Sequence, residues 1–70
     1  SKGEYNKALE YYQKSLKICE KVYGEEHPST ATSYNNIGLV YYSKGEYNKA
    51  LEYYQKSLKI REEVYGKEHP

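Results

Sequence analysis

The sequence lacks the features that define several protein classes. It contains one cysteine among 70 residues, so no disulfide can form within the chain, and this agrees with a reducing compartment. No apolar run approaches the roughly 20 residues that span a bilayer, and no charged-then-apolar signal sequence opens the chain. Charges of both signs are interspersed and sum to +1, without the basic surface that nucleic-acid or anionic-membrane binding requires. We therefore expect a soluble, intracellular (cytoplasmic) protein that binds neither nucleic acid nor membrane.

Phenylalanine, tryptophan and methionine are also absent, whereas tyrosine occurs 11 times. Tyrosine combines a large apolar area with a polar hydroxyl, so we expect tyrosines to build much of the core. A chain of this size buries only roughly 60% of the surface that it exposes when unfolded. The core is therefore expected to be thin and the stability marginal.

One segment of the sequence occurs twice. GEYNKALEYYQKSLKI stands at residues 3–18 and again at 45–60, each time preceded by Ser-Lys. Residues 1–28 and 43–70 agree at an offset of 42 residues, with the only differences at Cys19/Arg61, Lys21/Glu63 and Glu25/Lys67. A fixed offset of this kind indicates stacked helical or solenoid units.

The repeated segment has the pattern of an amphipathic helix. In the second copy, apolar or small residues recur at helical spacing, with Lys, Glu and Gln on the other side. They are Tyr47, Ala50, Leu51, Tyr54, Ser57, Leu58, Val64 and Tyr65. Gly24 and Gly66 stand where a residue in the left-handed helical conformation would end each copy. We predict long helices over residues 4–23 and 46–65.

The segment between the copies predicts a shorter helix over residues 28–43. Pro28 suits the first turn of a helix, His27 or Ser29 is expected to be the N-cap, and Gly45 closes the segment. The sequence therefore predicts a long, a short and a long helix joined by short turns.

Gly38 lies inside the shorter helix, where glycine costs about 1 kcal/mol relative to alanine. Close approach of a partner helix would compensate for this cost. Tyr34 and Tyr41 flank the glycine, and the small Ala50 and Ser57 stand at matching places on the following helix. This alternation predicts two antiparallel helices that interdigitate.

These residues resemble the tetratricopeptide repeat (TPR). Tyr34-x-x-Ile37-Gly38-x-x-Tyr41, followed by Ala50-x-x-x-Tyr54, is similar to the signature of that family, with Tyr for the usual Trp and Phe and Ile for Leu. The linking SKGEY looks like the turn between helices A and B of the repeat. The resemblance implies an all-α fold, an α-solenoid of antiparallel helix pairs, here with three helices in the order B, A, B.

The length of the period indicates a subtype. The common repeat has about 34 residues, and the longer offset extends helix B by about two turns. The long period and GEEHPSTATSYNNIG are similar to the repeats of kinesin light chain and related 42-residue TPR proteins. We expect residues 1–70 to form a single unit of a longer array, because the first helix B lacks the helix A, equivalent to residues 29–42, on which it would pack.

The resemblance implies a non-catalytic protein-interaction scaffold, in which helix A lines a concave groove that holds an extended peptide or partner segment. Transferred residue by residue, the groove positions are Thr32, Asn35, Asn36, Leu39 and Tyr42. Asn36 is the best single candidate, because the family often uses Asn here to hydrogen-bond a ligand, and an amide both donates and accepts. The alternative is that Asn35 and Asn36 are only solvated, as surface polar residues usually are, or cap neighbouring helices.

A second hypothesis is a structural unit whose main partner is another copy of itself. Repeat proteins bury each face against a neighbour and usually need about three or more repeats with polar caps. We therefore expect the two long helices to expose apolar residues that pair between chains by stacking or helix exchange. The candidates are Leu9, Tyr12 and Leu16 on the first helix and Tyr54, Leu58 and Ile60 on the last.

The sequence shows no pattern of catalytic or metal-binding residues. His27 and His69 are copies of one loop position, without Cys or carboxylates at ligand spacing. Cys19 has no base placed near it, as a nucleophile would need. Glu25 and Glu26 fit a solvated turn better than an acid-base pair. We expect neither enzymatic activity nor a cofactor or metal.

Overall fold

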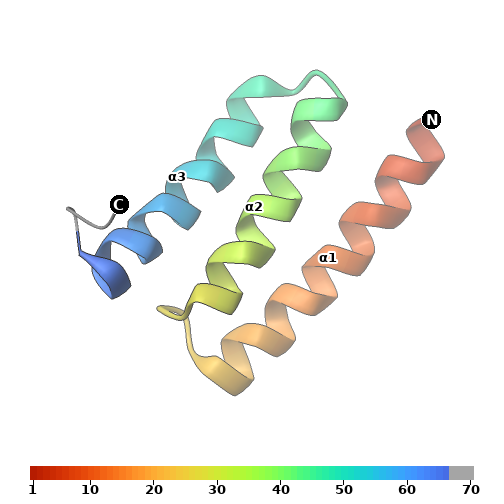
Figure 1. The fold of residues 1–70 in the computed structure, drawn as a ribbon. Coiled ribbons are helices and arrows are strands. Elements are labelled where there is room, and N and C mark those ends of the chain that lie inside the picture. The colour runs from red at the N-terminus through yellow and green to blue at the C-terminus, as the bar shows by residue number, and fades with distance from the viewer. Residues whose placement is uncertain (67–70) are drawn as a thin grey trace.

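The computed structural model describes residues 1–66, which form three α-helices. They are α1 (Lys2–Tyr23), α2 (Pro28–Ser43) and α3 (Tyr47–Tyr65). The helices lie side by side with α2 in the middle, and neighbouring helices run antiparallel (Figure 1). No strand occurs in this part of the chain. The predicted all-α fold is confirmed.

The helix starts depend on local side-chain caps. The first helix begins two residues before the expected start, because the Ser1 hydroxyl accepts a hydrogen bond from the Glu4 N–H at 3.4 Å. The second begins at Pro28, where Nδ1 of His27 accepts the Ser29 N–H at 3.0 Å. His27, and not Ser29, is therefore the N-cap. Its ring also stacks on Tyr23, with 4.5 Å between the centroids.

Two glycines end the long helices, but not in the conformation expected. Gly24 has φ 92° and ψ 171°, and Gly66 has φ 87° and ψ 160°. Positive φ with extended ψ is a region open essentially to glycine alone, and it differs from the left-handed helical region. Each glycine N–H donates to the carbonyl four residues earlier, Glu20 at 3.0 Å and Glu62 at 2.8 Å. The glycine requirement is confirmed, whereas the predicted conformation was wrong.

The core between α1 and α2 is aliphatic rather than tyrosine-rich. Leu9 of α1 packs with Ile37 and Val40 of α2, and all three are buried. Partly buried side chains surround this cluster, namely Tyr5, Ala8, Tyr12, Leu16, Tyr41 and Tyr53. The expectation of a tyrosine core was therefore wrong in detail, because the phenol rings border the buried cluster without entering it.

The contact between α2 and α3 depends on small residues. A Cβ atom on Gly38 would lie 2.8 Å from Cε1 and 2.9 Å from Cδ1 of Tyr54, and 3.3 Å from the carbonyl oxygen of Ala50. Ala50 and Ser57 are both buried on this side of α3. The close helix approach predicted from Gly38 is confirmed.

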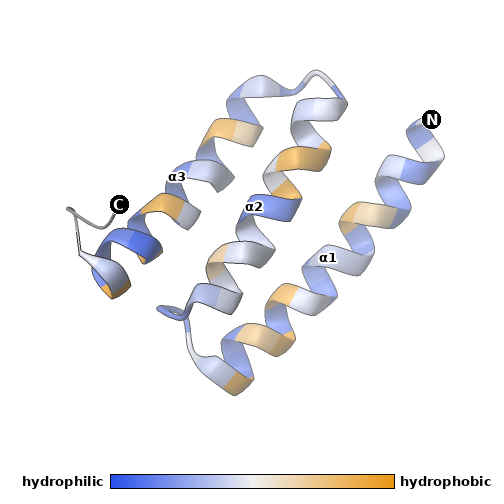
Figure 2. Ribbon diagram, viewed as in Figure 1, coloured by the Kyte–Doolittle hydropathy of each residue, from blue (hydrophilic) through white to orange (hydrophobic). Residues whose placement is uncertain are grey.

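Apolar positions alternate with hydrophilic ones along all three helices (Figure 2). Within the described residues, none of the helices is both long enough and apolar enough to cross a membrane.

Candidate functional site

The side of α2 that faces away from its neighbours carries most of the predicted groove positions. Thr32, Asn35, Leu39 and Tyr42 follow one another at spacings of three and four residues, which places them on one side of a helix. Thr32, Leu39 and Tyr42 are exposed, and Asn35 is half-buried. We call these four residues the groove face. It presents two large apolar side chains beside polar ones.

Asn36 lies next to the groove face rather than within it. It follows Asn35 directly and is therefore turned about 100° around the helix. It is half-buried, on the edge of α2. Within residues 1–66, no hydrogen bond is found for the amide side chains of Asn35 and Asn36, and neither residue caps a helix. Both amides thus keep their hydrogen-bonding capacity, whereas the Thr32 hydroxyl already donates to the Pro28 carbonyl at 3.1 Å.

An aromatic contact extends the groove face onto the next helix. The rings of Tyr42 and Tyr47 meet edge to face, with centroids 5.3 Å apart and planes at 61°. Both tyrosines are exposed. The pair gives a continuous apolar surface across the turn between α2 and α3. The resemblance assigned Tyr42 to this site, whereas Tyr47 was not among the predicted groove positions.

A tyrosine-lysine cluster joins α2 to α3 and was not predicted. Tyr53 of α3 stacks on Tyr41 with centroids 5.5 Å apart, and it lies 6.1 Å from Tyr34. The Lys56 ammonium lies 5.5 Å from the Tyr34 ring and 5.4 Å from the Tyr53 ring, and that of Lys49 lies 5.3 Å from the Tyr41 ring. These are cation-π distances. The seven-residue spacing of Tyr34 and Tyr41 indicated a shared side of α2, but the lysines depend on the helix packing.

Burial raises the pKa of two phenols of this cluster, those of Tyr34 and Tyr53. Desolvation is the main cause that raises the pKa of Tyr34, and the nearby Glu20 carboxylate adds to it. The Tyr34 hydroxyl donates to Oε2 of Glu20 at 3.4 Å. Desolvation likewise raises the pKa of Tyr53. Such phenols act as hydrogen-bond donors and packing surfaces, and they are poor candidates for general bases.

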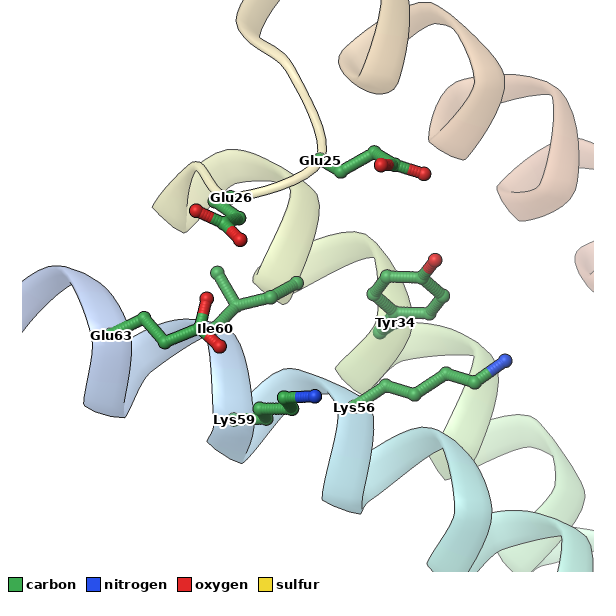
Figure 3. A pocket seen from close by; sticks show the side chains of 7 residues that line it. All are labelled: Glu25, Glu26, Tyr34, Lys56, Lys59, Ile60 and Glu63. Atoms are coloured by element: carbon green, nitrogen blue, oxygen red, sulfur yellow. The ribbon is translucent and has the colours of Figure 1, made fainter.

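A pocket of about 270 Å³ lies at the end of α3, against the turn between α1 and α2 (Figure 3). It is lined by Glu25, Glu26, Tyr34, Lys56, Lys59, Ile60 and Glu63. Glu26 and Glu63 approach from the turn and from α3 (Figure 3). A hydrogen bond with Glu63 and the repulsion between the two carboxylates raise the pKa of Glu26 above its ordinary value of 4.5.

The described residues that the sequence offered for catalysis or metal binding are Glu25, Glu26, His27 and Cys19. Glu25 and Glu26 are both exposed, as expected for a solvated turn. No group of three His, Cys, Asp or Glu side chains that could hold a metal ion occurs in the described part of the chain. Cys19 is half-buried, where it accepts from the Ser33 hydroxyl at 3.5 Å. His69 lies outside the described residues.

The predicted exposure of the self-association candidates was largely wrong. Two of the candidates, Leu9 and Ile60, are buried. Two others, Tyr12 and Leu16, are partly buried against the α1–α2 cluster, and Tyr54 is half-buried beneath Gly38. Only Leu58 is exposed. The reason is that α2 covers one side of α1 and a different side of α3. Other apolar residues are exposed instead, among them Tyr11, Ile18 and Val22 on α1 and Tyr47 and Leu51 on α3.

Comparison with known families gives one match. The family model described as tetratricopeptide repeat matches residues 1–63. No curated protein matches the chain significantly.

Proposed function

The chain belongs to the tetratricopeptide repeat family, and we propose that it is a non-catalytic scaffold whose groove face holds an extended peptide or partner segment. Proteins of this family generally mediate protein-protein interactions. One observation supports a peptide ligand: α2 carries both exposed apolar side chains and free amides. Leu39 and Tyr42 are exposed, and the amides of Asn35 and Asn36 have no hydrogen-bond partner among the described residues.

The proposed contact follows from what an extended peptide needs. Every backbone N–H and C=O that leaves water must find a partner. An Asn amide offers both a donor and an acceptor, so one side chain can satisfy both groups of a peptide unit. Asn35 on the groove face and Asn36 at the edge of α2 place two such amides on adjoining sides of the helix. Leu39 and the Tyr42–Tyr47 pair then provide apolar area for alternate peptide side chains.

We further infer the 42-residue subtype similar to kinesin light chain repeats. The support is the position of the glycines that end α1 and α3, because Gly24 and Gly66 stand at the same 42-residue offset as the repeated sequence. Helix α3 continues unbroken to Tyr65 before this stop.

Selection of a ligand tests the groove proposal. A displayed library of extended peptides would be selected against the wild-type chain, and the affinity of a selected peptide measured by fluorescence anisotropy. We expect Asn36→Ala and Tyr42→Ser each to weaken binding about tenfold, which corresponds to about 1.4 kcal/mol and to one hydrogen bond or one apolar contact. Asn6→Ala is the matched control, because this Asn is exposed on α1, away from the groove face.

Two outcomes would contradict the groove proposal. Unchanged affinity in both groove variants, with helicity retained in circular dichroism, would show that the peptide binds elsewhere. Equal losses in Asn6→Ala and Asn36→Ala would show that amide removal acts through the fold instead of the groove.

A second candidate function is self-association through the outer sides of α1 and α3. It is favoured by the exposed Ile18 and Val22 on α1 and Leu58 on α3, since apolar patches on a small protein often mark interfaces. Sedimentation velocity should show a mass that rises with concentration and a smaller rise for Leu58→Glu. Lys59→Gln changes the net charge by the same amount at an exposed site turned about 100° around α3 from Leu58, and it is the control. A helical monomer at all concentrations would contradict this function.

A further inference from the structure

Two exposed phenol rings meet across the turn between α2 and α3. Tyr42 lies in the last turn of α2, and Tyr47 is the first residue of α3. Their centroids lie 5.3 Å apart, which is within the range of aromatic contact, and the residues are 58% and 59% exposed. We call Tyr42 and Tyr47 the turn tyrosines. The fold thus brings two solvent-exposed phenols from two helices into contact.

The backbone of the turn holds these rings close together (Figure 1). The Gly45 N–H donates to the Tyr42 carbonyl at 3.0 Å. The next N–H, that of Glu46, donates to the Tyr41 carbonyl at 2.9 Å. The proximity of the turn tyrosines is therefore a property of the turn itself and needs neither a ligand nor a partner.

The tyrosines of the tyrosine-lysine cluster have different surroundings. The Lys56 ammonium lies 5.5 Å from the Tyr34 ring and 5.4 Å from the Tyr53 ring. The Lys49 ammonium lies 5.3 Å from the Tyr41 ring. All three tyrosines are half-buried. Their rings are therefore less accessible than the turn tyrosines, and positive charge covers them.

This difference separates the tyrosines by their ease of oxidation. An ammonium is attracted by the π electrons of the ring beneath it, and removal of an electron from that ring weakens the attraction. The lysines therefore oppose oxidation of the cluster. Among the described residues, no cation-π contact is found for the turn tyrosines, and their exposed phenols are open to an oxidant in solution.

We propose that the turn tyrosines are a site of oxidative cross-linking, at which a haem peroxidase with hydrogen peroxide joins them as dityrosine. Each phenol loses one electron and its hydroxyl proton, and the two phenoxyl radicals couple through a carbon–carbon bond between their ortho ring carbons. The two ortho protons then move to the phenolic oxygens, which restores both aromatic rings. The two electrons and two protons removed from the phenols reduce hydrogen peroxide to two molecules of water.

The first copy of the repeated segment provides an internal comparison. Tyr5 is the equivalent of Tyr47, and the sequence around it is identical from residue 1 to 18 and from 43 to 60. Tyr5 is half-buried beside the α1–α2 cluster, and no contact between its ring and another aromatic ring is found in the part of the chain that the structure describes. We therefore expect cross-linking at Tyr47 and none at Tyr5.

Peptide mapping locates the cross-link. Trypsin cuts after lysine, which places Tyr42 in the peptide of residues 22–44 and Tyr47 in that of residues 45–49. The peptides 3–7 and 45–49 are identical, so the chain carries Tyr5→Phe to give them different masses. After oxidation at micromolar protein concentration and reduction of thiols, we expect peptides 22–44 and 45–49 joined at their summed mass less two hydrogen atoms.

Substitutions that keep the ring test the partners. Tyr42→Phe and Tyr47→Phe should each abolish the joined peptides, because phenylalanine has no hydroxyl and forms no phenoxyl radical. Tyr11→Phe is the matched control at a residue that is 72% exposed, and it should leave the yield unchanged. Joined peptides that persist in Tyr42→Phe, or linkage between chains alone, would overturn the proposal.

A lysine substitution tests the protection of the cluster. Lys56→Gln removes the ammonium over Tyr34 and Tyr53 and should raise the linkage of peptide 22–44 to the peptide that contains Tyr53 about threefold. Lys59→Gln makes the same change of charge at an exposed residue and should not raise it. Equal yields in the two variants would overturn the directing role of the lysines.

Thermal unfolding supplies a readout that does not depend on mapping. A bond between the two rings closes a loop around residues 43–46 and restricts the unfolded chain, as a disulfide does. Oxidation should therefore raise the Tm of the Tyr5→Phe chain but not of the same chain with Tyr42→Phe. An unchanged Tm in a fully linked chain would overturn the inference that the turn holds the rings ready to couple. Asn36→Ala should leave the yield unchanged, so this proposal and the groove proposal fail independently.

Discussion

Replacing Gly38 with alanine should destabilise the protein, although alanine is the better helix former. Alanine gains about 1 kcal/mol in a helix interior. Its Cβ would lie 2.8 and 2.9 Å from two ring carbons of Tyr54 and 3.3 Å from the Ala50 carbonyl oxygen. Overpacking of this kind costs about 1–3 kcal/mol, and the Ala50 carbonyl belongs to the helix backbone and cannot easily move. We expect a net loss of about 1 kcal/mol.

Urea unfolding followed by circular dichroism measures this loss, repeated at several protein concentrations to detect association. A change of this size would lower Tm by about 4–8 °C in a domain of this length. Gly3→Ala is the matched control, because this glycine lies in α1 and a Cβ there meets nothing within 4 Å. It should stabilise the chain by at most about 1 kcal/mol.

A double-mutant cycle isolates the contact. In a Tyr54→Ala background the clash with the ring is gone, so Gly38→Ala should become stabilising, with a coupling energy of about 1–3 kcal/mol. A stabilising effect of Gly38→Ala in both backgrounds, similar to that of Gly3→Ala, would refute the reasoning that Gly38 exists to admit Tyr54.

Two further changes test polar groups. Ser57→Ala should stabilise the fold by about 1 kcal/mol, because the buried Ser57 hydroxyl has no hydrogen-bond partner in the described residues. The control is Ser15→Ala at the equivalent, half-buried position, which should change the free energy of unfolding in urea by less than about 0.5 kcal/mol. Equal effects of the two changes would contradict this explanation. Because Glu63 raises the pKa of Glu26, the Glu26 carboxyl group holds its proton more tightly in the folded chain than in the unfolded chain. The stability of the fold therefore falls as the pH rises from the ordinary pKa through the raised one. Glu63→Gln should therefore raise Tm near neutral pH and have less effect below the ordinary pKa of 4.5, and a shift independent of pH would contradict this cause.

The fold could be predicted because its determinants are local or periodic. Pro28 and the terminating glycines fix the helix ends through backbone geometry, which neighbouring residues alone decide. Gly38 revealed the α2–α3 contact because a glycine inside a helix is costly unless something requires it. The resemblance predicted Thr32, Leu39 and Tyr42 as groove positions, and the structure places all three on one exposed side of α2.

Burial could not be predicted, because identical residues have different surroundings. Ile18 and Ile60 occupy the same position in the two copies, yet Ile18 is 63% exposed and Ile60 is 8% exposed. No property of the repeated sequence distinguishes them. The difference arises from the place of α2, which lies on one side of α1 and on another side of α3. The pairing of Glu26 with Glu63 has the same origin, since two elements distant in the sequence bring the carboxylates together.

Within the described residues, α2 is the only helix whose backbone lies close to both others, since no Cα atom of α1 lies within 8 Å of one in α3. Opening of α1 can therefore proceed while α2 and α3 stay paired, which makes the chain a linear series of two coupled units. The repeated sequence makes this measurable, because equivalent amides in residues 3–18 and 45–60 have the same neighbours in sequence and hence closely similar intrinsic hydrogen-exchange rates. The ratio of their exchange rates by NMR then gives the difference between the opening free energies of the first and last helices, with each helix serving as the reference for the other.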